Sequence, residues 1–238
     1  LRNNRLKCVF KRIGSAVDGK IVAYEALMRS DTEPMVSPLT ILKYASRNHM
    51  TYDIEKLTFS NVLSEMDKAG EIFRNRRLFI NFIPGFLLTD EDFQQNIARY
   101  RELTGRMVIE ITEQRELEDE ALQIIHKRQE LTGFRLAIDD FGSGCSNTNS
   151  LLRYMPEVIK LDRLLISGID SNTKKQYFVS SIITFAHTNS MSVLAEGVET
   201  EAELRMVIRL GVDLIQGYYT AKPAYEFLEE IPAQIRNT

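Results

Sequence analysis

Three carboxylates stand where short apolar runs of the sequence end. Glu110 closes the run MVIE, and Asp139 follows the run LAI. Glu196 follows VLA in the same way. A buried carboxylate is costly unless it is paired or holds a metal, so these positions indicate a site rather than a solvated surface. Oxygen ligands without His or Cys favour the hard ions Mg²⁺ or Mn²⁺, with Ca²⁺ as an unreactive competitor.

The adjacent pair Asp139-Asp140 adds a second chemical feature. Neighbouring carboxylates at a strand end could serve two ions, one of them bridging. Two ions roughly 3.5–4 Å apart activate a water and stabilise the leaving oxygen in phosphodiester hydrolysis. Lys160 offers a positive charge for the attacked phosphate or for orienting the nucleophile. Arg29, four residues after Glu25, could hold a phosphate oxygen through two hydrogen bonds.

Plainer structural readings stay open for several of these residues. Glu25 could be a solvated strand end, and Asp162 could cap the turn that follows it. Gly142 and Gly144, directly after the aspartate pair, fit either an ordinary turn or a loop that a ligand approaches closely. All the acidic residues together are harder to explain in this way, because like charges crowded at one rim repel and a bound cation relieves them.

These side chains need elements that bring them together, and the apolar runs are candidate strands. We expect strands at Leu6–Lys11, Lys20–Met28, Arg77–Phe82, Arg106–Ile111, Phe134–Ile138, Val158–Leu161, Ser192–Ala195 and Leu214–Tyr218. Several are near-continuous apolar runs, which is typical of parallel strands buried on both faces. Eight strands separated by helical patterns favour a closed α/β barrel over an open sheet.

A barrel of this kind gathers the carboxyl ends of its parallel strands at one rim, where active sites form. The polar residues expected at that rim are Glu25, Arg29, Asn81, Glu110, Glu113, Asp139, Asp140, Lys160, Asp162, Glu196, Glu199 and Gln216. The barrel prediction therefore turns residues scattered along the chain into one candidate site.

Helix signals lie between the strands. Thr200 followed by Glu203 predicts a capping box, and Gly211 predicts the end of the same helix. The segment Glu116–Leu131 carries acidic residues first and basic residues last, as the helix dipole favours. Ser37-Pro38 and Thr51–Glu55 predict two further helix starts.

The first two strands depart from this alternation. Their turn signal, Asp18-Gly19, leaves no room for a helix between them. Strands joined so closely pair in antiparallel fashion. We therefore expect a barrel that is modified at its first strand.

Composition excludes several classes of function. The 238 residues carry a formal net charge of −3, and the pI near 5.8 argues against DNA or RNA polymers, which need a basic face. No apolar run reaches the length of a membrane span, so we expect no membrane contact by this segment.

Two cysteines far apart in sequence favour a reducing compartment. The length suits one barrel domain over residues 1–238, and a chain that starts at Leu1 suggests processing or an excised domain.

The motifs YEALMR, IEITE, AIDDFGSG, IKLD, AEGVET and QGYY, in this order, resemble the EAL phosphodiesterase domains that hydrolyse cyclic di-GMP in bacteria. The resemblance implies a TIM-like (β/α)8 barrel with an antiparallel first strand. It also implies Mg²⁺- or Mn²⁺-dependent opening of the cyclic dinucleotide to linear pGpG, with Ca²⁺ inhibitory. We further expect a homodimer coupled through residues 142–154, a cytoplasmic location, and possible fusion to sensor or GGDEF-type domains or to a membrane anchor outside this chain.

The resemblance assigns roles residue by residue. Those that match the family's metal ligands are Glu25, Asn81, Glu110, Asp139 and Asp140. Lys160 resembles the lysine beside the catalytic water, Glu196 the general base or second-site ligand, and Glu113 the glutamate that holds the DDFGSG loop. The substrate-binding residues implied are Arg29, Leu27, Gln216, Glu199 and Asp162.

The chain also departs from the family pattern, and alternatives follow. Lys11-Arg12 replaces the usual Gln-Pro of the first strand, where the glutamine contacts substrate; the two cations could meet phosphate or face solvent. Cys145 and Asn147 stand where Tyr and Ser are common. A receptor that binds cyclic di-GMP without turnover is therefore the main alternative. An unrelated Mg²⁺-dependent lyase or aldolase barrel is a remote one, because Lys160 alone would have to serve as its catalytic lysine.

Overall fold

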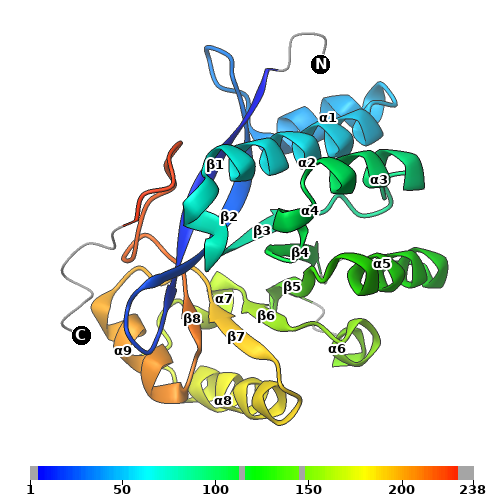
Figure 1. Ribbon diagram of the computed structural model, residues 1–238. Helices are drawn as coiled ribbons and strands as arrows, with labels where there is room; N and C mark the ends of the chain where they lie inside the picture. The colour runs from blue at the N-terminus through cyan, green and yellow to red at the C-terminus, as the bar shows by residue number, and fades with distance from the viewer. Residues whose placement is uncertain (1–4, 113–115, 145–147, 230–238) are drawn as a thin grey trace.

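The computed structural model describes residues 5–112, 116–144 and 148–229. Its strands close into one barrel in chain order (Figure 1). They are β1 Leu6–Ser15, β2 Ile21–Ser30, β3 Arg77–Asn81, β4 Met107–Thr112, β5 Arg135–Phe141, β6 Val158–Leu161, β7 Ser192–Ala195 and β8 Leu214–Ile215. The predicted barrel is confirmed.

The first strand runs against both of its neighbours, as predicted. β1 pairs with β2 and with β8 in antiparallel fashion, whereas every other neighbouring pair is parallel. β1 is longer than the sequence suggested, because it continues to Ser15 before the turn at residues 16–18. β8 is shorter, because the chain bends after Gln216, where the Gly217 N–H donates to the Thr220 hydroxyl.

Helices surround the barrel in Figure 1. They are α1 Pro38–Arg47, α2 Thr51–Lys68, the 3-10 helix η1 Gly70–Arg74, α3 Asp90–Arg99, α4 Arg101–Thr104, α5 Asp119–Thr132, α6 Thr148–Tyr154, α7 Arg163–Ile166, α8 Thr173–Thr188 and α9 Glu201–Leu210. The helix expected from Glu116 begins three residues later, at Asp119. Among the described residues, no helix combines the length and the apolar character needed to cross a bilayer.

Local capping explains where several helices begin. The Ser37 hydroxyl accepts from the Thr40 N–H at 3.2 Å, which starts α1. The predicted capping box of α9 is confirmed, since the Thr200 hydroxyl accepts from the Glu203 N–H while the Glu203 carboxylate accepts from the Thr200 N–H. Glu203 also accepts from the Glu199 and Gly168 N–H groups. One buried carboxylate therefore ties together the loop after β7 and the segment after α7.

Two layers of side chains fill the barrel interior. The apolar layer, here called the floor layer, consists of Ile13, Ala23, Phe79, Val108, Ala137, Val158 and Leu194, with Leu214 packed against it. Side chains two residues apart on a strand share a face. The residues two positions beyond the floor layer are therefore inward-facing and polar, and they make up the rim ring: Lys11, Glu25, Asn81, Glu110, Asp139, Lys160, Glu196 and Gln216.

The outward faces of the strands bury a second, larger core against the helices. Leu78, Ile80, Leu136 and Ile159 belong to it together with helix residues such as Leu63. Each such side chain contributes about 1.5–3 kcal/mol when fully buried. Below the rim the strands are thus buried on both faces, which explains why their sequences are near-continuous hydrophobic runs.

Candidate active site

Lys160 is the centre of the rim ring. Its side chain is fully buried, and its Nζ lies 2.7 Å from Asp139 Oδ1, 3.0 Å from Glu196 Oε1 and 3.3 Å from Glu25 Oε1. It also contacts Glu110 Oε1. These carboxylates come from four other strands or strand ends, β2, β4, β5 and β7, so the closed barrel is what brings them to one ammonium group.

The charges around Lys160 shift one another's pKa values. Burial alone would lower the pKa of Lys160, but the carboxylates, Asp139 first, outweigh it and raise the pKa well above its usual value. Burial raises the pKa of Glu110 well above its ordinary range, and Asp139 and Glu25 add to the rise. Burial likewise raises the pKa of Glu196 to about 7. The single positive charge of Lys160 therefore does not balance the negative charges of the carboxylates around it.

A bulge in β5 brings both aspartates into the site. Ile138 pairs with Ile159 and Phe141 with Leu161, so Asp139 and Asp140 together lie opposite the single residue Lys160. Asp140 has a φ of 56°, in the left-handed region that non-glycine residues rarely adopt. Such conformations cluster at functional sites. The bulge overrides the alternation that would send the two side chains to opposite faces of the sheet.

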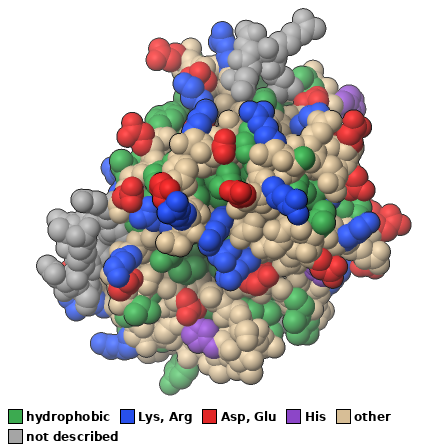
Figure 2. Space-filling view, viewed as in Figure 1, with side chains coloured by type: hydrophobic (Ala, Val, Ile, Leu, Met, Phe, Trp, Pro, Cys, Tyr) green, Lys and Arg blue, Asp and Glu red, His purple; other side chains and the backbone are tan. Residues whose placement is uncertain are grey.

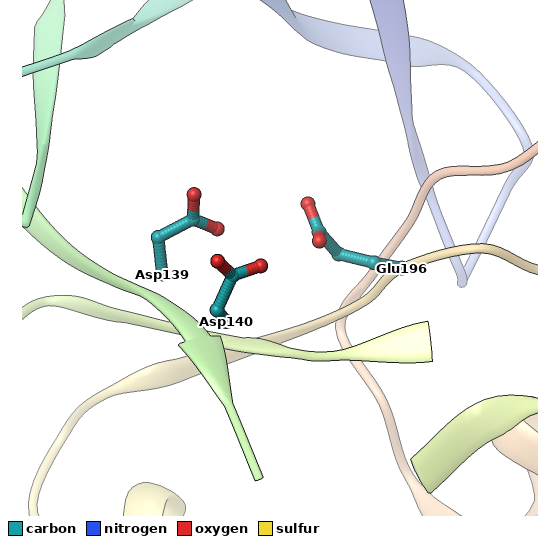
Figure 3. Close-up of side chains that lie close together, drawn as sticks. All are labelled: Asp139, Asp140 and Glu196. Carbon is teal, nitrogen blue, oxygen red and sulfur yellow. The ribbon is translucent and has the colours of Figure 1, made fainter. Parts of the chain in front are cut away.

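The carboxylates of Asp139, Asp140 and Glu196 converge. One oxygen from each lies within 4.8 Å of the others, and Figure 3 shows the three side chains pointing toward one another from β5 and from the end of β7. Burial and the neighbouring Asp139 raise the pKa of Asp140 to about 6. Glu110 Oε2 is buried without a hydrogen-bond donor. An all-oxygen donor set with an unpartnered buried oxygen and surplus negative charge fits a hard divalent cation.

Glu25 on β2 is positioned by Gln216, which follows β8 on the other side of β1. Gln216 Nε2 donates to Glu25 Oε2 at 2.9 Å, and both side chains are buried. Gln216 Oε1 is buried without a partner. Burial would raise the pKa of Glu25, but the charges of Lys160 and Lys11 and the Gln216 amide more than offset it and lower the pKa. Glu25 is thus held as a carboxylate.

A cleft of about 260 Å³ opens beside this cluster. Among its lining residues are Leu27, Arg29, Glu196 and Glu199, all named in the sequence analysis, together with Lys11. Leu27 and Arg29 also line an adjoining, mostly apolar hollow of about 210 Å³ that reaches Asn81. The predicted substrate-binding residues Leu27, Arg29 and Glu199 therefore share the wall of a space next to the carboxylates.

The remaining predicted residues lie in varied settings. Asn81 is exposed at the end of β3, where it pairs in register with Glu110. The Asp162 carboxylate accepts from the Leu164 N–H at 2.7 Å and caps α7, which confirms the capping alternative. Glu199 pairs with Arg163 at 2.7 Å. Glu113, Cys145 and Asn147 lie outside the described residues.

The two glycines after the aspartate pair differ. Gly142 has a φ of 96°, and a Cβ there would collide with the side chain of Leu165. Gly144 has no such backbone angle, and a Cβ there would meet open space. Gly142 is therefore explained by backbone angle and packing, and nothing comparable constrains Gly144.

For Lys11 the sequence left open whether the side chain faces phosphate or solvent; it lies in the rim ring, two residues before Ile13 and opposite Glu25. One residue of the site region was not predicted from the sequence. Glu55 is a buried carboxylate on α2 whose Oε2 accepts from the Ile83 N–H at 3.1 Å. It thus contacts the segment that follows Asn81. No local pattern marked it, because it lies in the middle of an ordinary helix.

The fold and site define a closed α/β barrel with one inverted strand and a carboxylate-rich, lysine-centred rim. The family model described as EAL domain matches residues 1–223. The chain belongs to the EAL domain family.

Individual relatives agree with this membership. The chain is 35% identical over 166 residues, 66% of its length, to the probable cyclic di-GMP phosphodiesterase PdeA of Escherichia coli. It is 28% identical over 200 residues, 82% of its length, to the E. coli cyclic di-GMP phosphodiesterase PdeF. These matches span 21% and 27% of the two relatives, so the chain spans about a quarter of the length of these curated proteins.

Solved structures share the barrel. A standalone EAL protein from Vibrio cholerae, in its cyclic di-GMP-bound form, superposes with a TM-score of 0.80 at 27% identity, with 97% of each chain covered. The Klebsiella pneumoniae protein BlrP1, in a complex with manganese and cyclic di-GMP, has a TM-score of 0.82 at 25% identity and covers 94% of this chain and 57% of its own.

Proposed function

We propose that this domain hydrolyses cyclic di-GMP to linear pGpG with the help of Mg²⁺ or Mn²⁺. The observation that carries the proposal is the cluster of four buried or half-buried carboxylates around Lys160, two of which, Asp139 and Glu196, also converge with Asp140. The relatives named cyclic di-GMP phosphodiesterases support the substrate.

The residues that would hold the metal are Glu25, Asn81, Glu110, Asp139 and Asp140, with Glu196 beside them. A divalent cation held there would activate a water molecule and neutralise charge on the phosphate. The protein's own contribution is to hold the carboxylates ready. Gln216 orients Glu25, the β5 bulge brings Asp140 beside Asp139, and Lys160 limits the repulsion among the acids.

The cleft next to this cluster has the chemistry of a nucleotide site. Its charged part, with Arg29, suits a phosphate. The adjoining apolar hollow between Leu27, Pro38 and Ile83 suits the face of a base. The combination of acid cluster, cation and apolar hollow is what favours a dinucleotide over a simple phosphate ester.

The direct test is product analysis. Purified protein incubated with cyclic di-GMP and Mn²⁺ should yield pGpG by chromatography, and EDTA should stop its formation. Ca²⁺ in place of Mn²⁺ should inhibit. Tight binding without product, under conditions in which an active family member turns over, would contradict hydrolysis and favour the receptor alternative.

We further propose that the domain acts as a homodimer in a reducing, cytoplasmic setting, joined to other domains. Leu152 on α6 exposes 61% of its surface within the segment 142–154 that is expected to couple the dimer to the site, and Met155, directly after that segment, exposes 57%. A relative from Pseudomonas aeruginosa, 32% identical over half of this chain, is named a bifunctional diguanylate cyclase/cyclic di-GMP phosphodiesterase. Activity that rises with protein concentration in parallel with dimer formation would support the coupling.

A further inference from the structure

The amino ends of the strands, opposite the rim ring, carry three arginines that the active site does not use. Arg77 is the first residue of β3, Arg135 is the first residue of β5, and Arg106 directly precedes β4. These strands are neighbours in the barrel. The three residues, here called the amino-end arginines, therefore belong to adjacent strands at the end of the barrel that faces away from the carboxylates.

Strand pairing brings the amino-end arginines together. The Leu78 N–H donates to the Arg106 carbonyl at 3.0 Å, which places Arg106 beside Arg77 on the neighbouring strand. Arg135 pairs in register with Val108, two residues after Arg106. The closed barrel thus gathers cations at this end, just as it gathers carboxylates at the rim.

Arg77 is influenced by both of the other amino-end arginines. Its side chain is half-buried, and its Nη1 donates to the Gly105 carbonyl at 3.1 Å. Burial lowers the pKa of Arg77, and the positive charges of Arg135 and Arg106 lower it further, while Glu157 opposes them. Like charges held together in a partly buried setting repel, and a bound anion relieves the repulsion.

Glu157 is already engaged by other groups. One of its carboxylate oxygens accepts from the Leu136 N–H at 2.8 Å, and the other accepts from the Gln129 side-chain amide at 2.8 Å. A single carboxylate that also serves these two donors does not balance three guanidinium groups. Positive charge is therefore in surplus at this end of the barrel.

A hollow of about 740 Å³ opens beside the amino-end arginines. It is lined mainly by η1, the end of α3 and α4, and Arg106 belongs to its wall. The other cations that line it are Arg74, Arg99 and Arg101. Sites for small molecules have volumes of roughly 300–1,000 Å³, so this hollow has room for a ligand of nucleotide size.

Three carboxylates also line the hollow. Glu71 pairs with Arg74 at 2.8 Å, and both side chains are exposed, so their charges offset each other. Asp67 and Glu102 are exposed as well, and the charges of exposed groups are strongly screened by water and salt. None of these acids engages Arg106 in an ion pair within the described part of the chain.

Several guanidinium groups here have donors to spare. Among the residues that the structure describes, Arg101, Arg106 and Arg135 form no ion pair, so their N–H groups are available to a ligand. Arg99 lies over the ring of Tyr100, 5.1 Å from its centroid, at the side of the hollow. A guanidinium group matches phosphate oxygens through two parallel hydrogen bonds, so a phosphate is the anion that this arrangement suits.

We propose that the amino-end arginines and the hollow beside them form a second binding site, which takes the phosphate groups of a small phosphorylated ligand. The site lies at the opposite end of the barrel from the carboxylates, so it is independent of the proposed hydrolysis. The phosphate groups can belong to a free polyphosphate or to a nucleotide, and the test distinguishes these two sources.

The test measures the binding of inorganic phosphate, pyrophosphate and ATP by calorimetry. EDTA is present, so that no divalent ion holds an anion at the rim. Arg106→Gln and Arg101→Gln are compared with Arg209→Gln, which removes an exposed charge on α9, and with Arg29→Gln in the cleft at the rim. Thermal unfolding shows that each variant is folded and gives a second measure of binding, because a ligand stabilises the native state.

Pyrophosphate and ATP should bind the wild-type protein more tightly than phosphate, and rising salt should weaken all three. Arg106→Gln should weaken the binding of pyrophosphate roughly tenfold or more, as expected for loss of a charge-assisted hydrogen bond. Arg101→Gln should weaken it less, because Arg101 is more exposed. Arg209→Gln and Arg29→Gln should bind as wild type does. Tighter binding of ATP than of pyrophosphate would identify a nucleotide as the ligand, and equal affinities would identify a free polyphosphate.

Three results would overturn the proposal. The first is the absence of saturable binding of every probe at millimolar concentrations. The second is an equal loss of affinity in Arg106→Gln and Arg209→Gln, which would mean that only the net charge attracts the anion. The third is a loss of binding in Arg29→Gln but not in Arg106→Gln, which would place the anion at the rim. Each result is obtained without cyclic di-GMP, so it leaves the proposed hydrolysis to its own test.

Discussion

Gln216 and Glu25 are 191 positions apart in sequence, yet the Gln216 amide donates to the Glu25 carboxylate at 2.9 Å inside the barrel. Their contact exists because β1 pairs with β8 on one side and with β2 on the other. The residues at the two ends of the fold thereby reach one another across the inverted strand. The strand pairings that close the barrel therefore also orient Glu25, a predicted metal ligand.

Replacing Gln216 tests this link. Gln216→Leu removes the donor and leaves a buried carboxylate oxygen of Glu25 without its partner. We expect the free energy of unfolding to fall by about 1–3 kcal/mol and kcat to fall roughly tenfold or more. Urea unfolding and steady-state kinetics measure the two effects. Gln95→Leu on the exposed surface of α3 is the control. Wild-type activity in Gln216→Leu would show that Glu25 needs no positioning from β8.

Removing Asp139 tests the acidic cluster. Asp139→Asn keeps the shape of the side chain but loses the charge that neighbours Lys160 and Asp140. Turnover should fall by roughly a thousandfold, about 4 kcal/mol of transition-state stabilisation. The stabilisation of the folded protein by Mn²⁺ should shrink as well, because ligand binding to the native state raises the melting temperature. Asp31→Asn, at an exposed ion pair with Lys7, is the control. Retained turnover would show that the ligand assignment is wrong.

Gly142 and Gly144 form a matched pair for the turn after β5. Gly142→Ala places a Cβ against Leu165 in a left-handed conformation, which should cost about 1–3 kcal/mol of unfolding free energy and disturb Asp140 two residues earlier. Activity should fall with stability. Gly144→Ala faces open space and should stay within about 0.5 kcal/mol of the wild type. Equal effects of the two substitutions, measured by chemical unfolding, would contradict the packing explanation.

Glu55 predicts a pH dependence of stability. Burial raises its pKa to about 8, although the Ile83 N–H favours the charged form. A folded-state pKa above the unfolded one means that the folded protein holds the proton more tightly. The carboxyl group is thus most favourable to folding below pH 4.5, and that contribution is lost as pH rises to about 8. The slope is at most about 1.4 kcal/mol per pH unit.

Glu55→Gln keeps an acceptor for Ile83 and removes the titration. The difference in unfolding free energy between variant and wild type, measured in EDTA from pH 5 to 9, should shift in favour of the variant as pH rises. Glu71→Gln, at an exposed ion pair on η1, should show no such trend. A constant difference between Glu55→Gln and the wild type would mean that Glu55 is charged throughout this range.

The surface adds little to these expectations. Figure 2 shows acidic and basic side chains intermixed over the face it presents, in keeping with a net charge of only −3. The charge that matters for the site is gathered at the rim. Most of this charge belongs to inward-facing residues, and the net charge of the whole chain does not reveal it.

Local patterns in the sequence were enough to predict the strands, several helices and much of the rim. Apolar runs, the capping box at Thr200 and the turn at Asp18-Gly19 are local signals, because burial and backbone hydrogen bonding act over a few neighbouring residues. They sufficed to predict eight strands, the inverted first strand and the strand-end residues Glu25, Glu110 and Lys160 as one group.

How those residues contact one another depends on the closed barrel. The β5 bulge that admits both Asp139 and Asp140, the contact of Gln216 with Glu25, and the inward orientation of Lys11 all depend on strand register around a closed barrel. Register is set jointly by every pair of neighbouring strands, and a shift of one residue would turn each side chain to the other face. No stretch of sequence a few residues long contains that information.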